Sequence, residues 1–445
     1  MSSSSFRLPL LGLWLILTAA GLTACGQTMM ATPVMFDEAR IDPFSKFDES
    51  QRTNEVTILY ATNRSASGPE TDRHYKNKVR DDLALGEVTV RLGSKNMTWD
   101  ELYEASTSAK RKGSITLHVQ DAVELAVIGP DDDPLNPPAG PASYADRINT
   151  ILADKPNKNI TIYIHGANVD FTKSSCTAAE FHHFMGRHGI MISFDWPSTQ
   201  SVITYGIDVK HAAMSVEPLT RFLEYLAANT DVARINLIGY SAGAQVLSPA
   251  MYNLRERYGE LDATEVKEKL RIGEIYFAAP DVDLRTFVLE HAPRFHDMAL
   301  STTLTINLND SVLALSQLSH FGKSRAGRPD IKELSLDESE LVIKLVDLPT
   351  FNVIDMSTSD PPTEANLKGH GYWYKSPWVS TDLIIQLIFH ASPAQRGLEI
   401  DTAERRRAEV WYYPDDYPDR VVARLKAYLA GLPAGQVPVA SPAPR

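Results

Sequence analysis

The chain has little cysteine, and its 44 basic residues are outnumbered by 56 acidic ones. Its 445 residues include only two cysteines, Cys25 and Cys176. If Cys25 carries a lipid, as argued below, Cys176 has no partner in the chain and no disulfide holds the fold. The formal net charge is −12. Such an acidic surface argues against a nucleic-acid partner and against simple attraction to anionic lipid.

A convincing metal-ligand pattern is also missing. Three histidines lie close together, at His182, His183 and His188. No carboxylate or cysteine accompanies them at ligand spacing, and one face of the expected helix there has to be buried. We therefore expect structural histidines, and neither a metal nor a cofactor.

The N-terminus has the features of an export signal. Arg7 precedes an apolar run over residues 8–20, which is too short to span a membrane and ends in Leu-Thr-Ala-Cys25. This ending resembles a bacterial lipobox, which implies cleavage before Cys25 and a lipid on its sulfur and amine. Gly26 after the cysteine favours the outer membrane, with the protein facing the periplasm. The alternative is a plain signal peptide with an incidental cysteine.

Composition divides the rest of the chain. Residues 26–54 are polar and contain proline, which is typical of a tether. The expected regions are a signal peptide at 1–24, a flexible tether at 25–54, N-terminal strands at 55–158 that join the main sheet, a catalytic core at 159–400, and a C-terminal helix with a disordered tail at 401–445. The helix is expected over 419–430 and the tail from Pro433.

Strand and helix patterns alternate through the core. After N-terminal strands at 56–60, 87–91 and 114–119, the expected core strands cover 160–164, 190–194, 235–239, 273–279, 304–308 and 341–345. Helical patterns lie between them, including apolar residues at i, i+3, i+4 and i+7 from Leu219. This alternation predicts an α/β fold with a mostly parallel sheet and helices on both faces.

The central motif is INLIGYSAG, residues 235–243, which contains Gly-x-Ser-x-Gly around Ser241. A nucleophilic serine has to stand on a sharp turn from strand to helix. Gly239 and Gly243 leave room there for the neighbouring strand and helix. The pattern predicts Ser241 as a catalytic nucleophile.

An oxyanion hole is expected beside this serine. The strand at 160–164 ends in His165-Gly166-Ala167, and Gly166 allows the backbone to bend close to the substrate. The N–H groups of Ala167 and Ala242 can then bind the oxyanion. We expect the side chain of His165 to brace this loop without transferring protons.

His370 is the best candidate base, because it follows the last expected strand between two glycines. The competing histidines lie in or beside expected helices: His291, His296, His320 and His390. For the acid, Asp310 ends the second strand after the nucleophile and is favoured. Asp281, at the end of the strand before that of Asp310, is the alternative.

Together these residues resemble a family of bacterial alpha/beta hydrolases known as a domain of unknown function, DUF900. The matching segments are 60–64 (YATNR), 163–168 (YIHGAN), 194–198 (FDWPS), 239–243 (GYSAG), 278–283 (AAPDVD), 309–310 (ND) and 369–370 (GH). Tyr240 and Ala242 replace the His and Met common in the family, which alters the lining of the pocket. The resemblance implies an alpha/beta-hydrolase fold and a Ser-acid-His triad.

The favoured function is hydrolysis of a small or surface-presented carboxylic ester, with the membrane contacted only through the lipid on Cys25. An amidase, peptidase or acyltransferase would use the same residues. A catalytically silent, lipid-anchored scaffold or binding protein is the alternative from another class. The residues indicate no particular oligomeric state.

Overall fold

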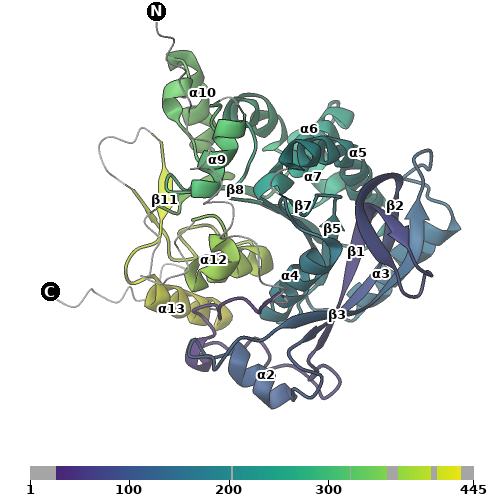
Figure 1. Ribbon diagram of the computed structural model, residues 1–445. Helices are drawn as coiled ribbons and strands as arrows, with labels where there is room; N and C mark the ends of the chain where they lie inside the picture. The colour runs from purple at the N-terminus through teal and green to yellow at the C-terminus, as the bar shows by residue number, and fades with distance from the viewer. Residues whose placement is uncertain (1–26, 202–203, 321, 358–368, 402–407, 432–445) are drawn as a thin grey trace, which may run out of the picture.

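The computed structural model describes residues 27–201, 204–320, 322–357, 369–401 and 408–431 (Figure 1). Eleven strands in these ranges form one sheet in the order β10-β11-β9-β8-β7-β6-β4-β5-β1-β2-β3. The strands are β1 Glu55–Ser67, β2 His74–Leu92, β3 Leu117–Ile128, β4 Asn159–Ile164, β5 Ile190–Asp195, β6 Arg234–Tyr240, β7 Ile272–Ala278, β8 Ser301–Ile306, β9 Phe351–Asp355, β10 Glu399–Ile400 and β11 Val410–Tyr412.

The sheet is parallel in its centre and antiparallel at its two ends. Every neighbouring pair from β1 through β5, β4, β6, β7, β8 and β9 to β11 is parallel. The pairs β1–β2, β2–β3 and β10–β11 are antiparallel. This is the mostly parallel α/β sheet with additional N-terminal strands that the sequence predicts.

Helices cover both faces of the sheet, and the strands divide their side chains between them. In β4, Ile160, Ile162 and Ile164 face one buried cluster, whereas Tyr163 faces the other. The first cluster receives side chains from α3 Ala139–Ala153, α5 Tyr205–Asn229, α6 Ala244–Arg257, α7 Ala263–Leu270, α8 Ala292–Phe295 and α10 Leu336–Val346. The second receives them from α2 Trp99–Ser106, α4 Phe171–Phe184, α11 Tyr372–Lys375, α12 Pro377–Phe389 and α13 Tyr417–Leu429. Burial on both faces explains the near-continuous apolar strands.

The expected strand at 341–345 is wrong, because this segment belongs to helix α10. Ser335 caps the helix and forms a capping box with Glu338. Leu345 is buried while Leu341 is 54% exposed, which is the one-sided burial of a helix. The last core strand is β9, whose five residues are all buried although Asn352 and Asp355 are polar.

The flexible tether expected over 25–54 is also wrong for the described residues 27–54. Met29, Met30, Met35 and Phe36 are buried, and the Met30 N–H donates to Glu180 Oε2 at 2.6 Å. A few apolar anchors hold this segment even though its overall composition is polar. The expected signal peptide and Cys25 lie outside the described residues. So does the tail from Pro433, while the expected helix before it is α13.

Candidate active site

Ser241 lies on a strained turn between β6 and α6. Its φ is +52°, a left-handed conformation that non-glycine residues rarely adopt. A Cβ on Gly239 would lie 2.8 Å from Leu247 Cδ2, and one on Gly243 would collide with the Ile164 carbonyl oxygen. The two glycines therefore permit the close packing that holds Ser241 in this conformation.

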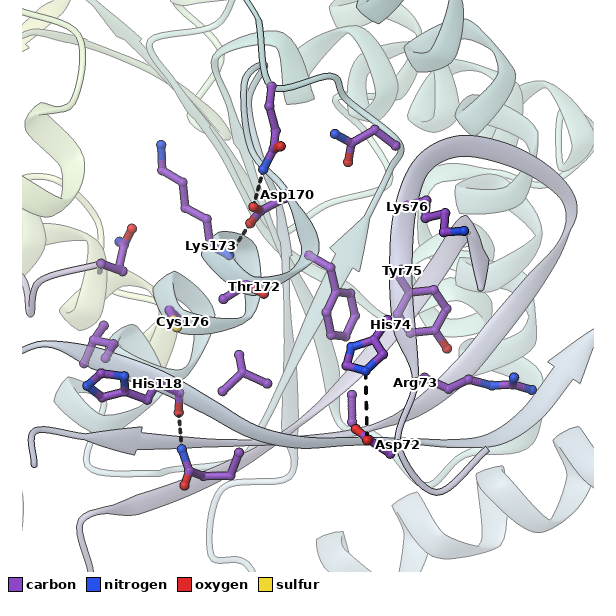
Figure 2. A pocket seen from close by; sticks show the side chains of 18 of the residues that line it. Asp72, Arg73, His74, Tyr75, Lys76, His118, Asp170, Thr172, Lys173 and Cys176 are labelled. Atoms are coloured by element: carbon purple, nitrogen blue, oxygen red, sulfur yellow. Dashed lines mark hydrogen bonds and ion pairs between the residues drawn. The ribbon is translucent and has the colours of Figure 1, made fainter. Parts of the chain in front are cut away.

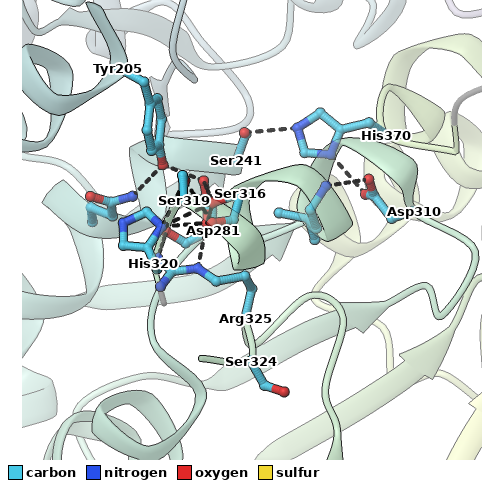
Figure 3. Close-up of polar contacts among 12 residues, drawn as sticks. Tyr205, Ser241, Asp281, Asp310, Ser316, Ser319, His320, Ser324, Arg325 and His370 are labelled. Atoms are coloured by element: carbon cyan, nitrogen blue, oxygen red, sulfur yellow. Dashed lines mark hydrogen bonds and ion pairs between the residues drawn. The ribbon is translucent and has the colours of Figure 1, made fainter. Parts of the chain in front are cut away.

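Three side chains from separate parts of the chain meet at this turn (Figure 3). The Ser241 hydroxyl is 2.8 Å from His370 Nε2 and can donate to it. His370 Nδ1 donates in turn to Asp310 Oδ2 at 2.7 Å. Asp310 is fully buried, whereas the His370 side chain is 11% exposed. This is the arrangement of nucleophile, base and orienting carboxylate that acyl transfer requires.

Asp310 is fixed by the helix that follows it. It is the N-cap of α9, Ser311–Ser319, and its Oδ1 accepts the N–H groups of Val312 and Leu313, both at 2.9 Å. This leaves Oδ2 for His370. One side chain thus both caps the helix and orients the imidazole.

Asn307 holds the segment that carries His370, a contact that sequence reasoning missed. Its Nδ2 donates to the Gly369 carbonyl at 2.9 Å. Gly369 has φ +59°, and a Cβ there would lie 3.0 Å from Asn307 Nδ2. The available signal was an Asn just after a strand and three residues before the acid.

Asp281 lies at the end of β7 but has different partners. Ser316 Oγ donates to it at 2.7 Å, the Tyr205 hydroxyl also binds it, and Arg325 Nε donates at 2.5 Å (Figure 3). The carboxylate and the guanidinium are both buried. The structure therefore brings Asp310, and not Asp281, to His370, although the Asp281 N–H supports the turn by donating to the Ser241 carbonyl at 3.0 Å.

The segment after β4 lies directly against Ser241. A Cβ on Gly166 would be 3.0 Å from Ser241 Cβ, so a larger residue would push the two segments apart. Ala167 follows Gly166, and Ala242 follows Ser241. The two residues expected to supply the oxyanion N–H groups thus lie on adjoining segments beside the serine.

Arg64 of β1 braces this segment, a role that the sequence analysis did not assign although its YATNR motif contains Arg64. The guanidinium is fully buried and donates to the Val169 carbonyl at 2.8 Å. It also lies 3.3 Å from His165 Nε2, while His165 Nδ1 donates to the Gly166 carbonyl at 2.7 Å. Burial lowers the pKa of His165 well below its usual value, and the charge of Arg64 lowers it further. A neutral His165 fits a bracing contact.

A family model for "Alpha/beta hydrolase of unknown function (DUF900)" matches residues 141–388, more than half of the chain. The chain belongs to this family of alpha/beta hydrolases. The matched region contains Ser241, Asp310 and His370. Arg64 and strands β1–β3 precede it.

Other comparisons add little to the DUF900 assignment. A lipase-esterase related protein from Clostridium acetobutylicum shares 11% identity, with 53% of this chain and 96% of that chain covered and a TM-score of 0.25. That score is too low for the superposition to carry an argument. No curated protein matches the chain.

Aromatic rings pack together beside His370 in the DUF900 site. The Tyr240 ring centroid lies 5.4 Å from that of His370, 5.7 Å from that of Trp373 and 6.1 Å from that of Tyr374. Burial raises the pKa of Tyr240 well above its usual value, so its hydroxyl stays protonated. Tyr240 therefore supplies a neutral aromatic surface beside the base.

Most of the other histidines of this hydrolase have partners away from Ser241. His291 Nδ1 lies 2.8 Å from Ser248 Oγ, His320 Nδ1 donates to the Ser316 carbonyl at 2.9 Å, and His390 lies 3.1 Å from Glu274. His183 Nε2 lies 2.8 Å from Ser106 Oγ. Among the described residues, no group of three His, Cys, Asp or Glu side chains is placed to hold a metal ion.

Proposed function

We propose that this DUF900 protein is a serine esterase that cleaves carboxylic esters through an acyl-enzyme. The single observation that supports this most is the pair of hydrogen bonds joining Ser241 to His370 at 2.8 Å and His370 to Asp310 at 2.7 Å. The strained conformation of Ser241 gives further support, because it presents the hydroxyl at a strand-to-helix turn.

The proposed reaction has two halves. Ser241 attacks the ester carbonyl while His370 accepts the hydroxyl proton and then donates it to the leaving alcohol. Asp310 holds the imidazole and stabilises its protonated form. The N–H groups of Ala167 and Ala242 bind the developing oxyanion, and losing one such donor costs about a hundredfold in rate. Water, activated by His370, then releases the acid and restores Ser241.

A small or surface-presented ester is the proposed substrate. The chain between β7 and β8 contains only the π-helical segment Thr286–His291 and α8 Ala292–Phe295. This connection is too short to supply a cap domain.

Labelling with a fluorophosphonate probe tests this function. The full chain, extracted in mild detergent, should react at one serine, and Ser241→Ala should abolish labelling while leaving the thermal unfolding curve two-state. Hydrolysis of 4-nitrophenyl esters should disappear in the same variant. A folded parent that neither labels nor hydrolyses esters would favour the silent scaffold, and cleavage of anilides in preference to esters would favour an amidase.

We also propose that the protein is anchored to the cell envelope, in the outer membrane facing the periplasm, by lipid on Cys25. Support comes from the sequence before Gly26. Within the described ranges, no helix is long and apolar enough to cross a membrane. Metabolic labelling with an alkyne fatty acid should mark the parent and not Cys25→Ala. Equal labelling of both proteins would refute the anchor.

A further inference from the structure

A large groove is lined by residues other than the catalytic ones, and the proposed mechanism does not use it. Its volume is about 1340 Å³. Figure 2 shows side chains that line it. One wall is built by β2, β3 and residues 27–28, and the other by the first turns of α4 together with Lys375 at the end of α11. The first wall lies outside the region that the DUF900 model matches.

The carboxylates of this groove already have partners. Asp170 caps α4 by accepting the Lys173 N–H at 2.8 Å, and its other oxygen accepts from Gln200. Asp72 lies 3.9 Å from His74 Nε2. Arg73 is likewise paired, with Glu124 at 3.0 Å. Both carboxylates keep their negative charge, because the partners of Asp170 are a backbone N–H and a neutral amide and that of Asp72 is a histidine. Glu124 offsets the charge of Arg73.

Three lysines of the groove have no charged partner in the part of the chain that the structure describes. Lys76, Lys173 and Lys375 line the groove, and within the described residues none of them forms an ion pair or donates a hydrogen bond through Nζ. Burial lowers the pKa of Lys173. The positive charge of Lys375 lowers this pKa further, whereas the negative charge of Asp170 raises it. Lys173 of α4 and Lys375 of α11 line the same groove, so an anion bound there would be attracted by two like charges.

The groove adjoins the catalytic residues through two shared segments. Lys375 ends the short helix that follows His370, and its ammonium lies 5.7 Å from the ring of Tyr374, which packs on Tyr240 beside Ser241. The second segment runs from Gly166, in contact with Ser241, to Asp170 in the groove wall. The Lys375 side chain also passes along the chain beside the base, because a Cβ on Gly371, the residue after His370, would lie 3.2 Å from Lys375 Cε.

We propose that this groove binds an oxyanion, a carboxylate or a phosphate, carried by the substrate beyond its scissile ester, with Lys173 and Lys375 as the binding residues. The inference rests on the proposed esterase function and names its substrate class, an ester that also bears an anionic group. Lysine ammonium groups act as compact point charges that suit either oxyanion. The N-terminal strands then contribute a wall for substrate recognition.

Matched ester pairs test the proposal. The full chain is assayed with 4-nitrophenyl valerate against mono-4-nitrophenyl glutarate, and with the octanoate against the suberate, which exchange a methyl group for a carboxylate. For an anion on the alcohol side, 4-ethylphenyl acetate is paired with (4-acetoxyphenyl)acetate. At least one pair should show about tenfold higher kcat/KM for the anionic ester. The preference should fall as salt rises.

Variants assign this preference to the groove. Lys173→Gln and Lys375→Gln should each reduce kcat/KM for the anionic ester about tenfold, the size expected for losing one charged hydrogen bond, and leave the neutral ester unchanged. Lys375→Arg should retain the preference. Lys344→Gln, which removes an exposed lysine of α10, should change neither ester.

The outcomes separate the two proposals. Turnover of neutral esters with no anionic preference, or a preference that survives both glutamine variants, would overturn the groove proposal and leave the esterase intact. If no ester is cleaved, the esterase proposal fails. Calorimetry of Ser241→Ala with glutarate and with inorganic phosphate then decides the groove alone: binding that Lys173→Gln and Lys375→Gln weaken supports it, and no binding refutes it.

Discussion

Asp281 and Asp310 both follow strands of the same parallel sheet, and each is buried, yet their surroundings differ completely. Asp310 divides its oxygens between two helix N–H groups and His370. Asp281 is enclosed by Tyr205, Ser316 and Arg325. A strand-end position therefore does not make a carboxylate a partner of the base. What decides is which distant segment folds onto it: the His370 loop or Arg325.

The largest expected effect is on Asp310. Asp310→Asn should lower kcat for ester hydrolysis about ten-thousandfold. The His370 imidazole loses the carboxylate charge beside it, and the amide no longer holds the proton on Nδ1. The free energy of unfolding should change little, since Asn caps helices as well as Asp does. Steady-state kinetics and urea unfolding measure the two effects. A loss of less than tenfold in kcat would remove Asp310 from the proposed triad.

Asp281→Asn should show the opposite pattern. It leaves the buried Arg325 guanidinium without its charge partner, which typically costs about 3–5 kcal/mol in the free energy of unfolding. Activity per folded molecule should stay within about threefold of the parent. Adding Arg325→Met should recover much of the stability. Unchanged stability with a thousandfold loss of kcat would make Asp281 the acid after all.

Gly369→Ala tests how the His370 loop reaches Asp310. The alanine would be held at φ +59° with its Cβ 3.0 Å from Asn307 Nδ2. We expect about 1 kcal/mol of strain and, from the displaced imidazole, a ten- to hundredfold fall in kcat. Gly322→Ala is the matched control, because Gly322 has φ +83° and open space around its Cβ position. Equal kinetic losses in both variants would show that the Asn307 contact does not position His370.

Tyr205→Phe removes one hydroxyl from the Asp281 cluster. It should lower the free energy of unfolding by about 1 kcal/mol and leave kcat unchanged, because only hydrogen bonds to Asp281 and Gln245 are lost. Thermal unfolding beside kinetics measures this. A tenfold rise in KM would instead show that the Tyr205 hydroxyl contacts substrate.

A third strand-end carboxylate, Asp195 of β5, extends the comparison to pH. Burial raises its pKa from 3.8 to about 7, against the opposing charge of Arg64. The folded state then holds this proton more tightly than the unfolded state, so this group makes stability fall as pH rises from about 4 to 7. Asp195→Asn should flatten that part of a pH series of urea midpoints. If the pH dependence of the urea midpoint is the same in both proteins, Asp195 is ionised in the folded state and the proposed proton uptake is wrong.

Local patterns were sufficient for the α/β alternation, for the Ser241 turn and for His370 between two glycines. They were insufficient for the segment 341–345, where the apolar cluster LVIKL fits a strand or one helix face equally well. The choice between Asp281 and Asp310 depended on Arg325, which is 44 residues beyond Asp281 in the chain and invisible to local spacing. The role of Arg64 was likewise hidden, because its partner Val169 is 105 residues away.

The pairing of β1 with β5 also sets the order in which the sheet can assemble during synthesis. The Thr62 hydroxyl bonds to the carbonyl of Asp195, 133 residues later. Strands β1, β2 and β3 can pair with one another as they emerge, but β1 cannot join the parallel part of the sheet until β5 has left the ribosome. Long-range parallel pairing of this kind is slow to form. Because Arg64 belongs to β1, its contacts with the loop beside Ser241 would form only after β1 and β5 have paired. A nascent chain that stops after β4 therefore carries β1 with its β5-facing edge unpaired, open to chaperones or to the edge strand of another chain.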